Sequence, residues 1–471
     1  MPTNPLRMLP SVGDLLEHPQ LKKLRDKVSH SVIVSRARGI LDELKHEVQA
    51  AAAEVRLPSP TELAERIARR ILQSNEPCLR PVINATGVLL HPRLGRAPLA
   101  EEAILEIAAV GRDYSSLDLE QPSGKSPPRE AAVAGLLQEL TSAESACVVN
   151  NQAAAVLLVL AALAKGRKAV VSRGELLEAA DHFRLADVAA TAGAGLCEVG
   201  ATNRTRLEDY RQAIDGQAVD GQAALLWQSD AHGHAAGTAE GVAQAELVRL
   251  GQEMQIPVVR HLELGALLDP AELGLAGLSS TAHSVRTRAD LVILPGDKLL
   301  GGPACGIVLG RRELIERLTR HPLARALRAD KLTLAALAAT LRLYRTPDVA
   351  RREIPILALL DTPVDNLKGR AQRLAPQLAA LPAIDTAEAV PGQACLEDPA
   401  MPGQQVPTWC VALRPARQDS GRLAKLLQAG VPSVVGRVEQ DRLLLDLRTV
   451  FPRQDQQLIE AIAAIEPAAS A

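Results

Sequence analysis

The sequence predicts an α/β fold with a mainly parallel central sheet, an N-terminal helical module and a small C-terminal α+β domain. Between residues 146 and 310, short continuous apolar segments alternate with helical segments, a pattern typical of parallel strands covered on both faces. Before residue 79 the periodicity is helical only, and near residue 347 the strand–helix rhythm changes. We therefore expect a helical module over 1–78, a large domain over 79–346 and a small domain over 347–471.

Composition narrows the classes of function. The chain has 471 residues, 47% of them hydrophobic but only 1% aromatic, and a net charge of −2. Reading single-stranded RNA by base stacking needs aromatic side chains, so any nucleic-acid contact must depend on charge and shape. Six cysteines without a CxxC pair argue against a zinc site or a disulfide framework. No signal-peptide core or membrane-length apolar run is present, so we expect a cytoplasmic protein that does not enter a membrane.

The N-terminal module is expected to consist of helices. A long amphipathic helix is predicted over residues 32–55, Pro58-Ser-Pro60 ends it, and Thr61 is a candidate cap of the next helix. Basic residues gather here, with acidic residues between them. They are either one solvated helix face or a module that touches a nucleic-acid backbone. The basic residues are Lys22, Lys23, Arg25, Lys27, Arg36, Arg38, Arg66, Arg69 and Arg70.

Residues 79–91 are predicted to begin the large domain with a strand that runs into Asn84. Because ligands of parallel α/β sheets bind beyond the carboxyl ends of the strands, the turns after the strands are the candidate site. The C-terminal domain is expected to have strands at 409–413 and 442–447, a helix at 457–465 and a surface loop at 390–405. The strands of the large domain are predicted at 146–149, 168–171, 195–199, 223–227, 257–260 and 291–294, followed by a further apolar run at 306–310.

Lys298 lies between two apolar segments, 289–294 and 306–310, after the turn at Pro295-Gly296. A lysine in a partly dry pocket has its ammonium form disfavoured, so its amine becomes available as a nucleophile. Such a lysine is suited to form a Schiff base with pyridoxal phosphate. The alternative is a lysine at a β-turn that extends its amine to solvent.

Two other stretches carry candidate residues. The polar turn Asn150-Asn151-Gln152 falls between a strand and a helix N-terminus, where free backbone N–H groups favour phosphate; alternatively it is only a helix cap. Arg325 and Arg328 are three residues apart, so on a helix they share one face. Two guanidinium groups side by side suit a phosphate-like oxyanion, and the alternative is pairing with surface carboxylates.

Together these residues resemble the bacterial selenocysteine synthases, the L-seryl-tRNA(Sec) selenium transferases, which are pyridoxal-phosphate enzymes of the aspartate-aminotransferase fold (fold type I). The resemblance runs from about residue 9 to the C-terminal strand, and its motifs occur in the same order as in the family. The matching segments are residues 80–87, 94–99, 149–158, 171–176, 198–205, 296–303 and 321–331.

The resemblance implies roles for individual residues. Lys298 would carry pyridoxal 5'-phosphate, and the Asn150-Asn151-Gln152 turn would hold its phosphate. Seryl-tRNA(Sec) would be converted to selenocysteinyl-tRNA(Sec) through an aminoacrylyl intermediate, with selenophosphate as donor. The helical module would recognise tRNA, and family members form rings of dimers. The residues implied around selenophosphate are Arg96, Asp297, Arg325 and Arg328.

The chain departs from the family pattern at several strand ends. His261 stands where the family has an Asp that faces the pyridine nitrogen, and Glu263 could compensate. A diverged relative is therefore an alternative: a pyridoxal-phosphate lyase or transferase with another amino-acid substrate, or a non-catalytic protein that binds tRNA or a partner. The other departures are Gln152 and the segments 124–129, 178–182 and 227–230.

Overall fold

The computed structural model describes residues 10–50, 58–75, 79–117, 131–176, 178, 183–216, 223–230, 240–275, 278–397 and 405–465. The chain divides into two compact units, Met1–Pro81 and Val82–Ala471, each of which is described by itself. The departures at 124–129 and 179–182 lie outside the described residues. No helix in the described ranges is both long and apolar enough to span a bilayer.

The N-terminal unit is helical, as predicted. Leucine, isoleucine and alanine side chains from its helices form one buried core. Ser59 caps the last helix, since its Oγ accepts from the N–H of Glu62 and the Glu62 carboxylate accepts from the N–H of Ser59. The expectation that Thr61 is the cap is therefore wrong. The helices are α1 (Val12–Leu16), α2 (Pro19–Lys22), α3 (His30–Ala50) and α4 (Pro60–Asn75).

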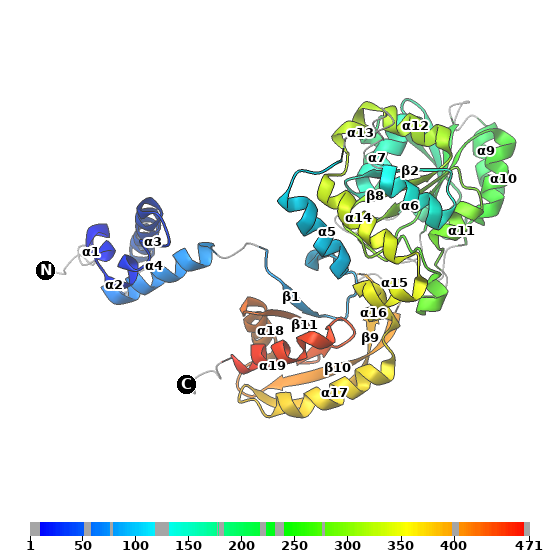
Figure 1. The fold of residues 1–471 in the computed structure, drawn as a ribbon. Helices are drawn as coiled ribbons and strands as arrows, with labels where there is room; N and C mark the ends of the chain where they lie inside the picture. The colour runs from blue at the N-terminus through cyan, green and yellow to red at the C-terminus, as the bar shows by residue number, and fades with distance from the viewer. Residues whose placement is uncertain are drawn as a thin grey trace. The chain divides into compact units, whose positions relative to one another are not determined.

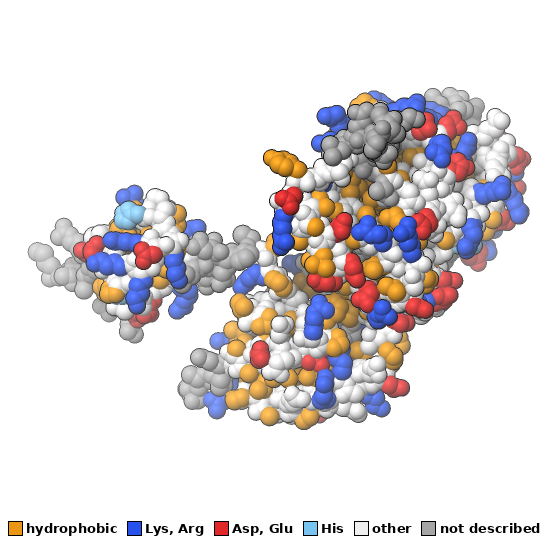
Figure 2. All heavy atoms as spheres, viewed as in Figure 1, with side chains coloured by type: hydrophobic (Ala, Val, Ile, Leu, Met, Phe, Trp, Pro, Cys, Tyr) orange, Lys and Arg blue, Asp and Glu red, His pale blue; other side chains and the backbone are white. Residues whose placement is uncertain are grey.

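Basic and acidic side chains are intermixed on the surface of this unit, on the face seen in Figure 2. Four of the nine basic residues singled out from the sequence form ion pairs: Lys22 and Arg25 with Glu17, and Arg66 and Arg70 with Glu43. The remaining five have no ion-pair partner among the described residues: Lys23, Lys27, Arg36, Arg38 and Arg69.

The second unit contains a seven-stranded sheet with the order β2-β8-β7-β6-β5-β3-β4 (Figure 1). Strands β4, β3, β5, β6 and β7 pair in parallel, and β8 runs antiparallel to both β7 and β2. Most of the inner strands are buried on both faces, which explains their continuous apolar sequences. The strands are β2 (Ser145–Val149), β3 (Lys168–Ser172), β4 (Gly195–Val199), β5 (Ala223–Ser229), β6 (Val258–His261), β7 (Leu291–Pro295) and β8 (Gly306–Gly310).

Helices cover both faces of this sheet. One face packs against α7 (Gln152–Leu163), α8 (Leu185–Thr191) and α12 (Arg312–Arg320). The opposite face packs against α9 and α10 at one end and α6 and α14 at the other. The bounds of the other helices of this region are α5 (Glu101–Arg112), α6 (Ala131–Thr141), α9 (Leu207–Asp215), α10 (Gln244–Met254), α11 (Thr281–Arg286), α13 (Pro322–Ala326), α14 (Lys331–Leu343), α15 (Pro347–Glu353) and α16 (Pro355–Asp361).

A second sheet, of five strands, has the order β1-β11-β12-β10-β9. Its apolar core includes side chains from α17, α18 and α19. β1 pairs in parallel with β11, so the strand predicted to open the large domain lies in the smaller sheet. The expected surface loop at 390–405 is also partly wrong, because β9 continues to Cys395 and β10 begins at Gln405. The elements are β1 (Val82–Ala85), β9 (Ile384–Cys395), β10 (Gln405–Pro415), β11 (Ser433–Glu439), β12 (Arg442–Asp446), α17 (Val364–Ala379), α18 (Ser420–Ala429) and α19 (Asp455–Ala463).

Candidate active site

The candidate site lies at the carboxyl ends of the parallel strands. Asp230 follows β5, His261 ends β6 and Lys298 follows β7, and these three strands are neighbours in the sheet. The N-terminus of α7, preceded by the Asn150-Asn151 turn, lies at the same edge because β2 is parallel to β7. Polar groups from four separate chain segments therefore converge at one edge, as the strand order requires.

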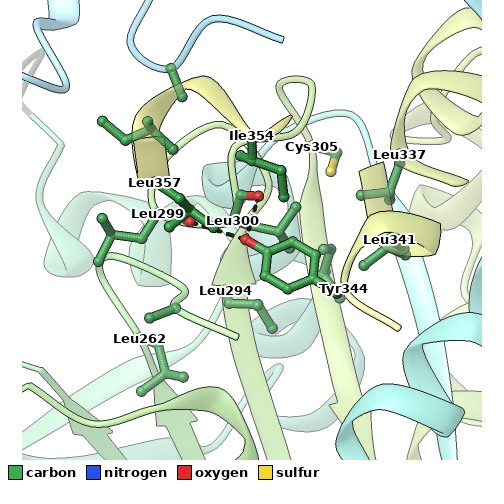
Figure 3. Packing of buried hydrophobic residues seen from close by; sticks show 14 of the residues in the cluster. Leu262, Leu294, Leu299, Leu300, Cys305, Leu337, Leu341, Tyr344, Ile354 and Leu357 are labelled. Carbon is green, nitrogen blue, oxygen red and sulfur yellow. Dashed lines mark hydrogen bonds between the residues drawn. The ribbon is translucent and has the colours of Figure 1, made fainter. Parts of the chain in front are cut away.

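The turn that carries Lys298 is fixed on both sides. The N–H of Gly296 donates to the carbonyl of Cys305 at 2.9 Å, and the N–H of Gly302 donates to the carbonyl of Gly296 at 2.8 Å. The next residues, Leu299 and Leu300, are buried in the apolar cluster of Figure 3. The Tyr344 hydroxyl donates to both of their carbonyls, at 3.3 and 2.8 Å. Lys298 is thus held in place, with 3% of its surface exposed.

Two carboxylates hold the amine of Lys298. Its Nζ lies 2.7 Å from Oε1 of Glu263 and 2.8 Å from Oε1 of Glu397. Burial lowers the pKa of Lys298, but the charges and hydrogen bonds of the two carboxylates outweigh burial and raise the pKa above its usual value. The expectation that a dry pocket would disfavour the ammonium form of Lys298 is therefore wrong. The expectation of a solvent-directed lysine is wrong as well.

Glu397 reaches the site from the smaller sheet. The N–H groups of Leu89 and Leu90 donate to the carbonyls of Cys395 and Leu396, which fixes the chain just before Glu397. Sequence reasoning missed this carboxylate, because it lies 99 positions from Lys298 in a stretch whose composition indicated a loop. Glu263 follows β6, two residues after His261.

Arg96 and Asp297 form a second contact beside Lys298. Arg96 Nη1 lies 3.3 Å from Oδ2 of Asp297, and the N–H of Ala97 donates to the Asp297 carbonyl at 3.2 Å. Both side chains are partly exposed. The structure thus brings together Lys298, Asp297 and Arg96, three of the residues implied by the resemblance. Their roles stay predictions.

The Asn150 turn is a helix cap in this structure. The Asn151 Oδ1 accepts from the N–H of Ala154 at 2.8 Å, and the N–H of Asn150 donates to the carbonyl of Leu327. Gly306 is required beneath this turn, since a Cβ there would lie 2.2 Å from the carbonyl oxygen of Asn151. No described residue accepts a hydrogen bond from the N–H of Gln152 or of Ala153. The two amides remain available to an anion, so the cap and the predicted phosphate site are compatible.

The side chain of Gln152 lies within the candidate site, beside His261. Its Nε2 lies 2.9 Å from Nε2 of His261 and 2.9 Å from the carbonyl of Leu262. The Trp227 ring lies 5.6 Å from the His261 ring, centroid to centroid. Burial, with smaller contributions from Lys298 and Arg260, lowers the pKa of His261 to about 4 although Glu263 opposes the shift. Gln152 and Trp227, two departures from the family pattern, therefore both lie beside His261, a third.

Arg325 and Arg328 do not share a helical face. Pro322 begins the short helix α13, which ends at Ala326, and Arg328 pairs with Val149 as an isolated bridge. Both side chains are exposed and line a groove beside β2. Neither guanidinium forms an ion pair with a described carboxylate, so the expected alternative of surface pairing is wrong for these residues.

Glu175 is a half-buried residue at the end of β3, in the 3₁₀ turn η3 (Arg173–Glu175). Its Oε2 accepts from the N–H of Ser229 at 2.8 Å, which ties the end of β3 to the end of β5. It lines a cavity of about 420 Å³ together with Arg260. Burial raises the pKa of Glu175 to about 7, although the Ser229 hydrogen bond and Arg260 lower it.

Replacing Glu175 with glutamine should stabilise the protein at pH 8 and much less at pH 5. The folded protein favours the protonated carboxyl, so ionisation costs stability as the pH rises from the ordinary value of 4.5 through about 7. This difference in pKa between the folded and unfolded protein corresponds to a loss of at most roughly 3 kcal/mol in the free energy of unfolding. Glutamine keeps the acceptor for Ser229 without the charge. Thermal and urea unfolding at both pH values would measure the difference, and a stabilisation independent of pH would contradict the prediction.

Comparison with known proteins identifies the family. A family model described as L-seryl-tRNA selenium transferase matches residues 82–451. The L-seryl-tRNA(Sec) selenium transferase of Moorella thermoacetica is 40% identical over 461 residues, which cover 98% of this chain and 96% of that protein. The chain belongs to the L-seryl-tRNA selenium transferase family. The resemblance drawn from the sequence motifs is thereby confirmed.

Other matches agree with membership of the L-seryl-tRNA selenium transferase family. A second family model, selenocysteine synthase N terminal, matches residues 6–44. The selenium transferase of Hyphomonas neptunium is 38% identical over 464 residues, covering 98% of this chain and 99% of that protein. A solved structure of D-glucosaminate-6-phosphate ammonia-lyase superimposes with a TM-score of 0.56 at 18% identity and covers 83% of this chain and 98% of that one. The predicted α/β fold with a mainly parallel central sheet is confirmed.

Proposed function

We propose that this chain converts seryl-tRNA(Sec) to selenocysteinyl-tRNA(Sec), with selenophosphate as selenium donor and pyridoxal 5'-phosphate bound at Lys298. The observation that carries the proposal is the buried Lys298 at the strand edge, within a chain that matches selenium transferases over nearly its whole length. The reaction replaces the Cβ–O bond of serine with a Cβ–Se bond and the P–Se bond of the donor with a P–O bond.

The residues at the strand edge fit the cofactor. Lys298 supplies the amine, the N–H groups of Gln152 and Ala153 are available to its phosphate, and His261 stands at the position that faces the ring nitrogen in the family. When bound, the cofactor supplies an electron sink for the charge that develops at the substrate Cα. The Lys298 ammonium must first give up a proton, and Glu263 and Glu397 are within hydrogen-bond distance to accept it.

Arg96, Arg325 and Arg328 are the cations we assign to selenophosphate, with Asp297 holding Arg96 in place. A phosphate-like dianion is well matched to guanidinium groups that lack a carboxylate partner, as Arg325 and Arg328 do among the described residues. The groove that these two arginines line is open to solvent. A donor bound there is thus reachable from outside the chain.

The N-terminal unit is assigned to tRNA. Its exposed Lys23, Lys27, Arg36, Arg38 and Arg69 have no ion-pair partner among the described residues and can contact phosphates of a folded RNA. The scarcity of aromatic residues is consistent with recognition by charge and shape. A homo-oligomer built as a ring of dimers and a cytoplasmic location remain predictions.

Purified protein should absorb at about 410–430 nm, as typical pyridoxal enzymes do, and borohydride should trap the cofactor on Lys298. Phosphate release from selenophosphate should then depend on seryl-tRNA. Absence of the absorption band would contradict both this function and the alternative of another pyridoxal-phosphate enzyme. A band without tRNA-dependent phosphate release would favour a different amino-acid substrate.

A further inference from the structure

His261 and Gln152 form a hydrogen-bonded pair at the bottom of the candidate site. His261 ends β6 with 6% of its surface exposed, and Gln152 begins α7. Their Nε2 atoms lie 2.9 Å apart. The residue that replaces the family's aspartate is thus in direct contact with another departure from the family pattern.

The carbonyl of Leu262 determines the direction of this hydrogen bond. Gln152 Nε2 also lies 2.9 Å from that carbonyl oxygen, which can only accept. Rotating the amide by 180° would place two oxygens against each other, so the NH₂ group must face both Leu262 and His261. Nε2 of His261 therefore accepts a hydrogen bond and carries no proton.

A neutral imidazole with an unprotonated Nε2 carries its proton on Nδ1. This N–H has no hydrogen-bond partner among the described residues. The charged groups that influence the ring are Glu263, Lys298 and Arg260, and the Trp227 ring covers it from β5. Burial and the two cations oppose a positive charge on the imidazole, while Glu263 favours one.

We propose that Gln152 fixes His261 as the neutral Nδ1–H tautomer, so that His261 donates a hydrogen bond to the cofactor's ring nitrogen and keeps that nitrogen unprotonated. A carboxylate at this position accepts from a protonated ring nitrogen, whereas an N–H donor requires an unprotonated one. This inference rests on the cofactor of the proposed function. It makes Gln152 a positioning residue, which acts through His261.

The test is nitrogen NMR of the protein reconstituted with pyridoxal phosphate labelled with ¹⁵N in the ring. We expect the chemical shift of an unprotonated pyridine nitrogen in the unsubstituted protein. Gln152→Glu should move it toward the pyridinium position, because the carboxylate accepts from Nε2–H and holds the imidazole proton on Nε2, which leaves Nδ1 of the neutral ring to accept from a protonated ring nitrogen. Gln244→Glu is the matched control, since Gln244 donates to the carbonyl of Ser284 rather than to His261 or Leu262, and it should leave the shift unchanged.

A pyridinium shift in the unsubstituted protein would overturn the proposal, as would an unchanged shift in Gln152→Glu. The cofactor-free protein labelled with ¹⁵N-histidine supplies an independent measurement. His261, assigned by its loss in His261→Gln, should show a protonated Nδ1, and a protonated Nε2 would overturn the role of Gln152. If borohydride traps no cofactor on Lys298, the proposed function is wrong, and so is the proposed contact of His261 with the ring nitrogen. The ¹⁵N-histidine spectrum of the cofactor-free protein still tests which tautomer Gln152 fixes.

Discussion

Replacing Lys298 with alanine is expected to lower the rate of selenocysteinyl-tRNA formation by roughly 10²–10⁴-fold or more, the range for loss of a positioned acid–base group. The substitution removes the amine that would carry the cofactor and move the Cα proton. It also leaves Glu263 and Glu397, both within 2.8 Å of the amine, without their shared cation. The variant should therefore lose both activity and some stability near neutral pH, because two neighbouring carboxylates repel each other.

Lys298→Arg separates the two effects. Arginine keeps a positive charge between Glu263 and Glu397 but cannot form a Schiff base with the cofactor. The melting temperature of Lys298→Arg should lie closer to that of the unsubstituted protein than the melting temperature of Lys298→Ala does. The activity of Lys298→Arg should be as low as that of Lys298→Ala. Single-turnover rates and thermal unfolding measure both quantities. Turnover by Lys298→Arg at the unsubstituted rate would exclude Lys298 as the cofactor lysine.

The large sheet was predictable because most of its inner strands are buried on both faces and therefore read as uninterrupted apolar segments. Six predicted strands agree with β2 to β7 to within two residues at each end, and the apolar run at 306–310 is β8. β1 was assigned to the wrong sheet, because a four-residue strand does not specify its partner. That partner, β11, begins about 350 positions later in the chain.

The candidate site was only partly predictable. The motifs located Lys298, Asp297 and Arg96, but a side-chain pair such as Lys298–Glu397 depends on how the smaller sheet meets the larger one. The prediction that Arg325 and Arg328 share one helical face was wrong, because it assumed helical spacing beyond the end of the five-residue helix α13. Local periodicity does not reveal where a short helix stops.

The departures from the family pattern become interpretable only in three dimensions. Gln152, Trp227 and His261 lie far apart in the sequence and look like unrelated changes. In the structure Gln152 lies within hydrogen-bond distance of His261, the Trp227 ring lies beside the His261 ring, and Glu263 pairs with Lys298. Glu263 thus places a carboxylate two residues after His261, in contact with the amine of Lys298.

Replacing Arg448 with methionine is expected to lower the free energy of unfolding by about 3–5 kcal/mol, as loss of one partner in a buried charged network does. Arg448 has 2% of its surface exposed. Its Nη1 donates to the carbonyls of Leu359, Leu360 and Thr362, and its Nη2 donates to the carbonyl of Pro407. Methionine fills much of the volume but leaves these carbonyls without that donor.

The exposed pair of Arg345 with Glu139 supplies a matched control. Both side chains are about half exposed, at 51% and 50%, and their ion pair lies on the surface. Arg345→Met should therefore cost only about 0–1 kcal/mol. Equal losses in the two variants, measured by urea unfolding, would contradict the prediction.

Arg448 also links the two sheets of the second unit. Leu359 and Leu360 lie in α16, whose apolar side chains belong to the core of the large sheet, whereas Pro407 lies in β10 of the smaller sheet. Glu397 reaches Lys298 from that smaller sheet, so a loosened contact between the sheets should weaken the ion pair of Glu397 with Lys298. Arg448→Met should accordingly lower the pKa of Lys298 toward its ordinary value as well as reduce stability. If the variant is less stable but the pKa of Lys298 is unchanged, Glu397 is held independently of the contact between the two sheets.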